Sequence, residues 1–392
     1  MNFNNRKPIF IIIIGIVLFG LGLFLLDYEK RRIPIMMKVS DEYEEQFWKY
    51  KNDIKTITFE SKIDIPKDAY EYWDVSLYKN RMVMAYVKKS GLFYDLYIQG
   101  NDVIYANPDS SYLFANFKSL TNINNIEILD TSMVENMENM FYSAEELLEL
   151  NLGNNFDTSK VTNMSGMFAF VGKNDLNFTF NLGDKFDTSN VVDMSFMFTH
   201  LGYSSLVFEL NLGEKFDTSK VTDMYSMFSG TGYSNPNFEL NLGNKFDTSK
   251  VTNMHGMFEE TGNISVVFNL DLGDKFDTSN VTNMGMMFNE AGYSNPSFVL
   301  YLGDKFDTSN VTNMMGMFSE IGYSNRNFVL DLGEKFNTSN VVDMSYMFSD
   351  AGYKSSIFKL DCSSWNVEKV EKHYKFNENV ESKVIEPKWV NK

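Results

Sequence analysis

The sequence has only one cysteine, Cys362, and three histidines among 392 residues. A single cysteine excludes an intrachain disulfide and a cysteine-based metal cluster. His200, His255 and His373 occur in unrelated contexts, without the serine, cysteine or carboxylate partners that would complete a catalytic set. No Walker-type or G-x-G-x-x-G phosphate loop is found either. We therefore expect no enzyme activity, no cofactor, no metal ion and no small-molecule substrate.

Positive charge is also scarce, because the formal net charge is −17. Residues 1–32 carry five basic and two acidic groups, so the remainder carries −20, since −17 minus +3 is −20. Nucleic-acid-binding proteins use basic surfaces to neutralise phosphates. An acidic chain of this kind argues against a nucleic-acid partner.

The segment from Ile9 to Leu26 contains eighteen residues without a charge. At about 1.5 Å per residue, this is about the minimum length for a helix that crosses a bilayer. A cleaved signal peptide is the alternative, but the run is longer than a usual signal core and no small-x-small site follows it. We expect a cytoplasmic N-terminus at 1–8, a transmembrane signal anchor at 9–26 and an extracellular C-terminal part.

The rest of the chain divides into four segments by composition. Residues 27–53 are predicted to form a charged helical spacer next to the membrane. Residues 54–110 contain the short apolar runs ITF, YWDVS, MVMAYV and FYDLYI, separated by turn residues, which predict a β-rich N-terminal cap. A separate binding domain is the alternative. A repeat solenoid is expected at 111–366 and a C-terminal cap at 367–392.

The dominant feature is a motif repeated every thirty residues, which predicts stacked coils. A shorter-spaced copy begins at Asp130 and a degraded copy at Trp365, as expected for the ends of a solenoid. The full copies begin at Phe156, Phe186, Phe216, Phe246, Phe276, Phe306 and Phe336.

One coil shows which elements each copy should form. Phe238, Leu240 and Leu242 alternate with polar residues, which predicts a half-buried strand. The Asp-Thr-Ser segment that follows resembles a helix cap, and the apolar spacing from Val251 to Phe258 fits a short helix. Successive strands should pair in parallel about 4.8 Å apart in a continuous ladder. Cys362 falls in a leucine column, where we expect a small buried hydrophobe.

Three columns within the repeats could carry chemistry, and each also has a structural explanation. The Asp residues could bind calcium, but helix capping is favoured because the dense Gly-Asp pattern of calcium repeats is missing. The Asn/Asp residues before methionine could form a binding site, although a hydrogen-bonded ladder is favoured. Methionine pairs such as Met254 and Met257 favour core packing over soft-metal binding. The first two columns are Asp157, Asp187, Asp217, Asp247, Asp277, Asp307; and Asn136, Asn163, Asp193, Asp223, Asn253, Asn283, Asn313, Asp343.

The best candidate for binding is the strand face that points away from the core, since solenoids bind partners through such continuous surfaces. Its residues vary from copy to copy, and a merely solvated face remains the alternative. A row of loop tyrosines, Tyr203, Tyr233, Tyr293, Tyr323 and Tyr353, could stack on sugar rings, or pack over the coil edge, which is favoured. The face comprises Glu209, Asn211, Glu239, Asn241, Asn269, Asp271, Val299, Tyr301, Val329 and Asp331.

The segment from Phe276 to Phe288, F-D-T-S-N-V-T-N-M-x-x-M-F, resembles the signature of BspA-like bacterial surface proteins with leucine-rich-repeat-like repeats. The resemblance implies an α/β repeat solenoid on a bacterial surface, with adhesion proposed for some members. The units here are longer than usual for that group, and no cell-wall sorting motif is seen. We expect a membrane-anchored protein that binds a host or matrix protein, a glycan or another cell. A structural surface component without a ligand is the alternative, and an enzyme site in the cap is a remote one.

Overall fold

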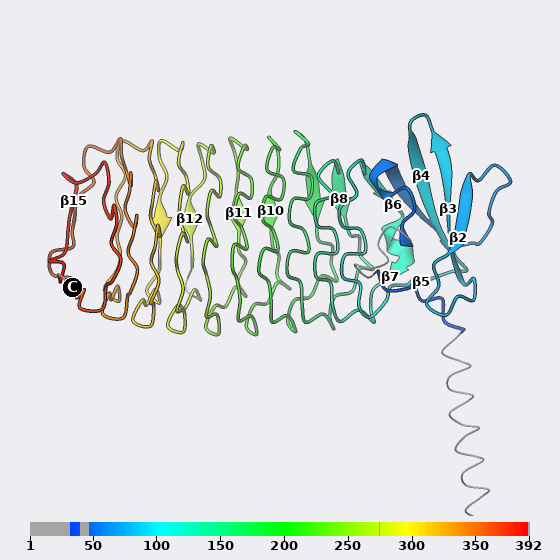
Figure 1. Ribbon diagram of the computed structural model, residues 1–392, viewed down its shortest axis with the longest axis horizontal. Coiled ribbons are helices and arrows are strands. Elements are labelled where there is room, and N and C mark those ends of the chain that lie inside the picture. Colours follow the sequence, from blue (N-terminus) through cyan, green and yellow to red (C-terminus); the bar gives the residue numbers. More distant parts are fainter. Residues whose placement is uncertain (1–31, 40–46, 274, 391–392) are drawn as a thin grey trace, which may run out of the picture.

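The computed structural model describes residues 32–39, 47–273 and 275–390. A domain built on a mixed sheet is followed by a long stack of coils that extends to the C-terminal end (Figure 1). The predicted anchor at 9–26 lies outside the described residues. Within the described ranges, no helix has the length and apolar character needed to cross a membrane.

The N-terminal sheet has the strand order β2-β3-β4-β1-β6. Strand β1 pairs in parallel with β4 and β6, whereas β3 is antiparallel to β2 and β4. The four apolar runs predicted as strands lie in β1 to β4, so this part of the prediction is confirmed. The bounds are β1 Ile54–Glu60, β2 Glu71–Asp74, β3 Val83–Ser90, β4 Phe93–Gly100 and β6 Asn122–Asn124.

The sheet and the coil stack share one core. Edge strand β6 comes from the first coil, and β5 (Ile104–Tyr105) pairs in parallel with β7 (Leu129–Asp130). Trp48 is fully buried, and its Nε1 donates to the carbonyl oxygen of Leu113 at 2.6 Å. The described part of the predicted spacer, including the 3₁₀ helix η2 (Lys51–Asp53), therefore belongs to this core.

Most repeats contribute a short strand that pairs in parallel, as predicted, with the strand of a neighbouring coil, whereas residues 328–333 form none. Leu210 lies beside Leu240, and Leu270 beside Leu300. The predicted continuous ladder is wrong, however, because the strands form separate two-stranded sheets, β8-β9, β10-β11, β12-β13 and β14-β15. Their bounds are β8 Glu149–Asn151, β9 Thr179–Asn181, β10 Leu210–Asn211, β11 Leu240–Asn241, β12 Leu270–Asp271, β13 Leu300–Tyr301, β14 Leu360–Asp361 and β15 Val384–Ile385.

Glycines in the turn after each strand show that the distance between successive coils alternates between short and long. A Cβ on Gly243 would lie 2.9 Å from the carbonyl oxygen of Gly213, across the β10-β11 pair. A Cβ on Gly273 would meet nothing within 4 Å. Backbones thus approach closely inside a pair and are farther apart between pairs.

The loop before each strand also bonds to the preceding coil. Within the β10-β11 pair, Nδ2 of Asn235 donates to the carbonyl oxygen of Phe208 at 2.5 Å. Between pairs, the shorter Ser205 reaches the carbonyl oxygen of Phe178 only at 3.4 Å. A long amide does not by itself close the spacing, because Nδ2 of Asn325 donates to the carbonyl oxygen of Phe298 at 2.9 Å although residues 330–331 form no strand.

The continuous ladder of the stack lies at the Asn/Asp column. Parallel bridges join every coil there, from Asp109 beside Asn136 to Asp343 beside Lys372. Side chains reinforce it, since Nδ2 of Asn313 donates to Oδ1 of Asn283 at 2.9 Å. The favoured structural role of this column is consistent with these bonds.

The short helix predicted in each coil does not form. From β7 onward the described residues contain no helix, and consecutive turns take its place. The amide of Met257 bonds to the carbonyl of Met254 in its own coil, but that of Phe258 bonds to Met287 in the next coil at 2.9 Å. Glu260 has left-handed backbone, with φ 56°, which interrupts a right-handed helix. Alternate amides are thus satisfied by the neighbouring coil.

Methionine, valine and phenylalanine columns fill the interior. Met254, Met257 and Phe258 are fully buried, as the core interpretation predicted. Phenylalanine rings of successive coils stack, with Phe258 and Phe288 5.9 Å apart between centroids and nearly parallel. Cys362 is buried in the leucine column, and burial raises the pKa of its thiol to about 12. It acts as a small hydrophobe, as expected.

Candidate partner-binding surfaces

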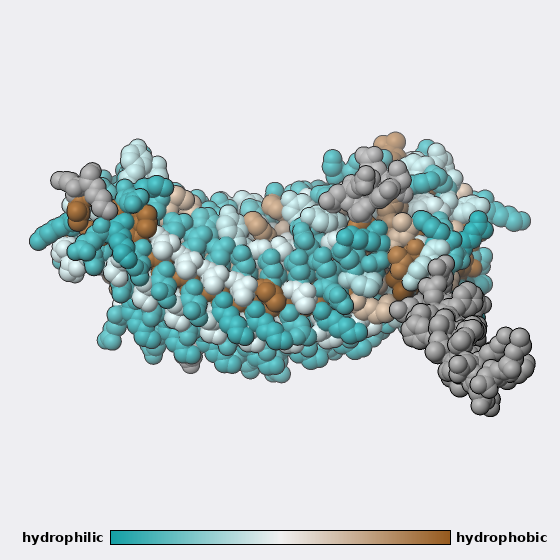
Figure 2. Space-filling view, turned by 60° about the horizontal axis from the view of Figure 1, so that its bottom comes forward, coloured by the Kyte–Doolittle hydropathy of each residue, from teal (hydrophilic) through white to brown (hydrophobic). Residues whose placement is uncertain are grey.

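The ten predicted face residues are all exposed. Some are direct neighbours, since Asn211 lies beside Asn241 and Asp271 beside Tyr301. The widened spacing between β11 and β12 separates these two groups. Equivalent residues of successive coils form rows along the stack. The side of the stack seen in Figure 2 is largely hydrophilic.

Half of these residues have a structural role that the sequence analysis missed. Oδ1 of Asn241 accepts a hydrogen bond from the amide of Gly243 at 3.0 Å, which is the geometry of an Asx turn. Asn211, Asp271 and Asp331 bond to the amides two residues later in the same way. Oδ1 of Asn269 accepts from the amide of the next coil's Val299. The signal was the Asn/Asp-Leu-Gly spacing at the end of each strand.

The five other candidates include three apolar residues on two adjacent coils. Val299, Tyr301 and Val329 are 36%, 57% and 60% exposed. Tyr301 lies on β13, and residues 330–331 of the following coil do not continue the strand pairing. Exposed apolar groups that gather on one surface are a common mark of an interaction site.

A hollow of about 730 Å³ is lined by Gly303 and Asp331, which follow Tyr301 and Val329 by two residues. It lies between the turn that follows β13 and the equivalent turn of the next coil. Three carboxylates and one ammonium group line it, so its formal charge is −2. The lining residues are Gly303, Asp304, Phe306, Asp331, Gly333, Glu334 and Lys335.

The loop tyrosines use their ring faces on one another. Tyr203 and Tyr233 stack with centroids 4.4 Å apart, and Tyr293, Tyr323 and Tyr353 continue the row at 4.6 and 4.9 Å. Flat sugar rings would need these same faces. The favoured interpretation, packing over the coil edge, agrees with this geometry.

The Asp column caps turns rather than helices. Oδ1 of Asp157 accepts from the amide of Ser159 at 2.9 Å. Burial alone would raise the pKa of Asp157, but hydrogen bonds from Ser159 together with the charges of Lys185 and Lys160 lower it overall. The described residues hold no group of three His, Cys, Asp or Glu side chains placed to bind a metal ion.

Acidic residues occupy equivalent positions in successive coils from Glu260 onward, a row that the sequence analysis missed. Glu259 and Glu260 lie beside each other, and Glu290 and Glu320 occupy the Glu260 position of the next coils. Burial raises the pKa of Glu259 to about 7, with a further increase from the charge of Glu260. Burial and the charge of Glu290 raise the pKa values of Glu260 and Glu320.

The histidines lie in aromatic stacks. His200 stacks with Phe170 and Tyr203, at centroid distances of 5.0 and 5.1 Å. Burial lowers the pKa of His200 to about 4, and the Lys173 charge lowers it further. Its buried Nδ1 has no hydrogen-bond partner among the described residues. A neutral imidazole in this position packs as an aromatic ring.

Stacked coils with one continuous bridge ladder and repeated short parallel sheets define a repeat protein. Three stretches of the chain, 109–231, 203–301 and 294–386, match the family described as Mycoplasma protein of unknown function, DUF285. Together they span well over half of the chain, so the chain belongs to the DUF285 family. No curated protein matches the chain, and no solved structure matches it.

Proposed function

We propose that this chain is a membrane-anchored bacterial surface protein whose coil stack binds a macromolecular partner without chemistry. The uncharged run at 9–26 supports the anchor, and the acidic remainder suits a domain held outside a cell. The F-D-T-S-N-V-T-N-M motif supports a relationship to BspA-like proteins with leucine-rich-repeat-like units. Proteolysis of intact cells tests this location, because an extracellular stack is degraded without lysis.

The observation that carries the proposal is the apolar group formed by Val299, Tyr301 and Val329 beside the acidic hollow. A large aromatic side chain at the centre of an exposed surface is a frequent hot spot in protein interfaces. Carboxylates at the rim add electrostatic selection of the partner. The chemistry fits a protein segment that presents an apolar side chain next to a lysine or arginine.

A binding screen of the full chain against glycans, matrix proteins and whole cells tests the proposal. A Tyr301→Ala, Val329→Ser double variant should weaken binding at least tenfold, the loss of about 1.4 kcal/mol expected on removing an interface anchor. Val207→Ser is the matched control, because Val207 is 56% exposed and lies three coils before Tyr301.

Two outcomes would contradict the proposal. Unchanged partner binding by the double variant would exclude this face as the site. A screen without any partner would favour the alternative of a structural surface component.

A further inference from the structure

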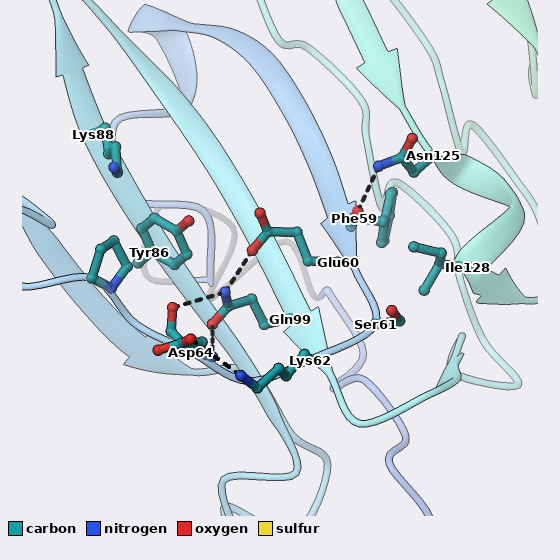
Figure 3. Close-up of a pocket in the computed structure, with 11 residues that line it drawn as sticks. Phe59, Glu60, Ser61, Lys62, Asp64, Tyr86, Lys88, Gln99, Asn125 and Ile128 are labelled. Carbon is teal, nitrogen blue, oxygen red and sulfur yellow. Dashed lines mark hydrogen bonds and ion pairs between the residues drawn. The ribbon is translucent and has the colours of Figure 1, made fainter.

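A second hollow, of about 510 Å³, lies at the junction of the N-terminal sheet and the first coils (Figure 3). The ends of β1 and β4 form one part of it, β3 supplies Tyr86, and η3 (Ile126–Ile128) supplies Ile128. Ligand sites of this size are common at domain junctions. Nothing in the predicted partner-binding face involves these residues.

One carboxylate in this hollow is held in a fixed orientation. Gln99 is 1% exposed, and its Nε2 donates to Oε2 of Glu60 at 2.5 Å and to the carbonyl oxygen of Asp64 at 3.3 Å. Its Oε1 accepts from the amide of Asp64 at 3.1 Å. Both ends of the buried amide are thus used, and Glu60 is positioned in advance of any ligand.

The lining holds two carboxylates and two ammonium groups, but neither lysine pairs with Glu60. Lys62 pairs with Asp64 at 3.3 Å, and Lys88 pairs with Asp68 at 3.1 Å. No ion pair to Glu60 is found among the described residues. The two lysines are therefore occupied by other carboxylates, and a negative charge is left at the wall of the hollow.

Apolar and aromatic surface surrounds this charge. Tyr86 stacks on Tyr97 with centroids 4.7 Å apart and rings nearly parallel. Figure 3 shows the second oxygen of Glu60 and the hydroxyl of Tyr86 on the same side of the hollow. Burial raises the pKa of Tyr86, and the Glu60 charge adds to the increase, so its hydroxyl stays protonated at neutral pH.

We propose that this hollow binds a small organic cation, a primary ammonium group on a short apolar body. Glu60 is its ion-pair partner, the Tyr86 oxygen is a second acceptor, and Ile128 contacts the apolar part. An ammonium group has three donors and no acceptor, which matches two converging oxygen atoms. A metal ion is disfavoured, because the described residues hold no group of three His, Cys, Asp or Glu side chains placed to bind one.

The test uses the full chain and three probes of one size, butylammonium, 1-butanol and butyrate, with binding followed by ligand-observed NMR. Butylammonium should bind at least tenfold more tightly than either other probe. Glu60→Gln should abolish that preference, since one charge-assisted hydrogen bond is worth about tenfold in affinity. Glu214→Gln, which changes an exposed carboxylate in the turn after β10, should change nothing.

Equal binding of the three probes to the unmodified chain would overturn the proposal, and this comparison needs no substitution. Preferential ammonium binding that survives Glu60→Gln would also overturn it. A thermal melt of the variant establishes that a lost preference is not lost folding.

Discussion

The buried threonines of the Asp-Thr-Ser segments should stabilise the stack through their hydroxyl groups. Thr188 is fully buried. Its hydroxyl donates to the carbonyl oxygen of Asp217 at 2.9 Å and accepts from the amide of the same residue at 2.7 Å. Two backbone groups of the next coil thus depend on one side chain. Thr188→Val keeps the shape of this side chain and removes both bonds.

The magnitude follows from these contacts. Each backbone group left without a partner should lower the free energy of unfolding by about 1 kcal/mol. This is the lower end of the range for buried groups, because Asp217 is only half-buried. Thr188→Val should therefore destabilise the stack by about 2 kcal/mol. Thr188→Ser keeps the hydroxyl and loses one methyl group, which should cost about 1 kcal/mol.

Urea unfolding followed by circular dichroism measures both variants. Hydrogen exchange at the Asp217 amide gives a local measure, and this amide should exchange faster in Thr188→Val than in Thr188→Ser. The more hydrophobic variant is thus expected to be the less stable one. If Thr188→Val were as stable as Thr188→Ser, the hydroxyl bridge would not contribute.

Three further predictions follow from single sites. Gly232→Ala should lower the melting temperature more than Gly213→Ala, because the new Cβ would lie 2.2 Å from the Phe238 ring in the first case and meet nothing within 4 Å in the second. Both have positive φ, so a similar strain of about 1 kcal/mol is common to the two, and equal melting temperatures would contradict the crowding argument. The pKa of Glu259 in the folded chain is about 7, above its ordinary value of 4.5. Folding therefore favours the protonated form of this side chain. The free energy of unfolding should fall as the pH rises from about 4.5 to above 7, because the side chain then loses its proton. The melting temperature should be lower at pH 8 than at pH 5, and Glu259→Gln should reduce this difference. An equal difference in the variant would show that other groups cause it. Cys362 should resist iodoacetamide at pH 8 in the folded chain and react after unfolding, and mass spectrometry showing rapid native labelling would refute its burial.

Local alternation made part of the fold predictable. The strand residues and the methionine and phenylalanine columns follow from the spacing of apolar residues, which is written within a few positions of the chain. The helix was predicted wrongly because Met254, Met257 and Phe258 fit one helical face and also fit a series of turns. The left-handed backbone at Glu260 has no signature in a non-glycine residue, and the hydrogen bonds that support it come from the next coil.

The candidate sites were less predictable, for two physical reasons. Exposure of Tyr301 and Val329 follows from alternation, but the hollow beside them depends on coil spacing that no single repeat encodes. The hollow around Glu60 needs Gln99 and Ile128 to meet it from distant positions in the sequence. Such convergence is a property of the tertiary fold.

Pairing of the strands in twos sets the size of the smallest interchangeable unit. Removing only the coil of β11 would leave β10 without its partner strand. Removing two coils would leave the order of wide and narrow spacings unchanged. We therefore expect length variants of this stack to differ by multiples of sixty residues, and single-coil deletions to unfold at the new junction first.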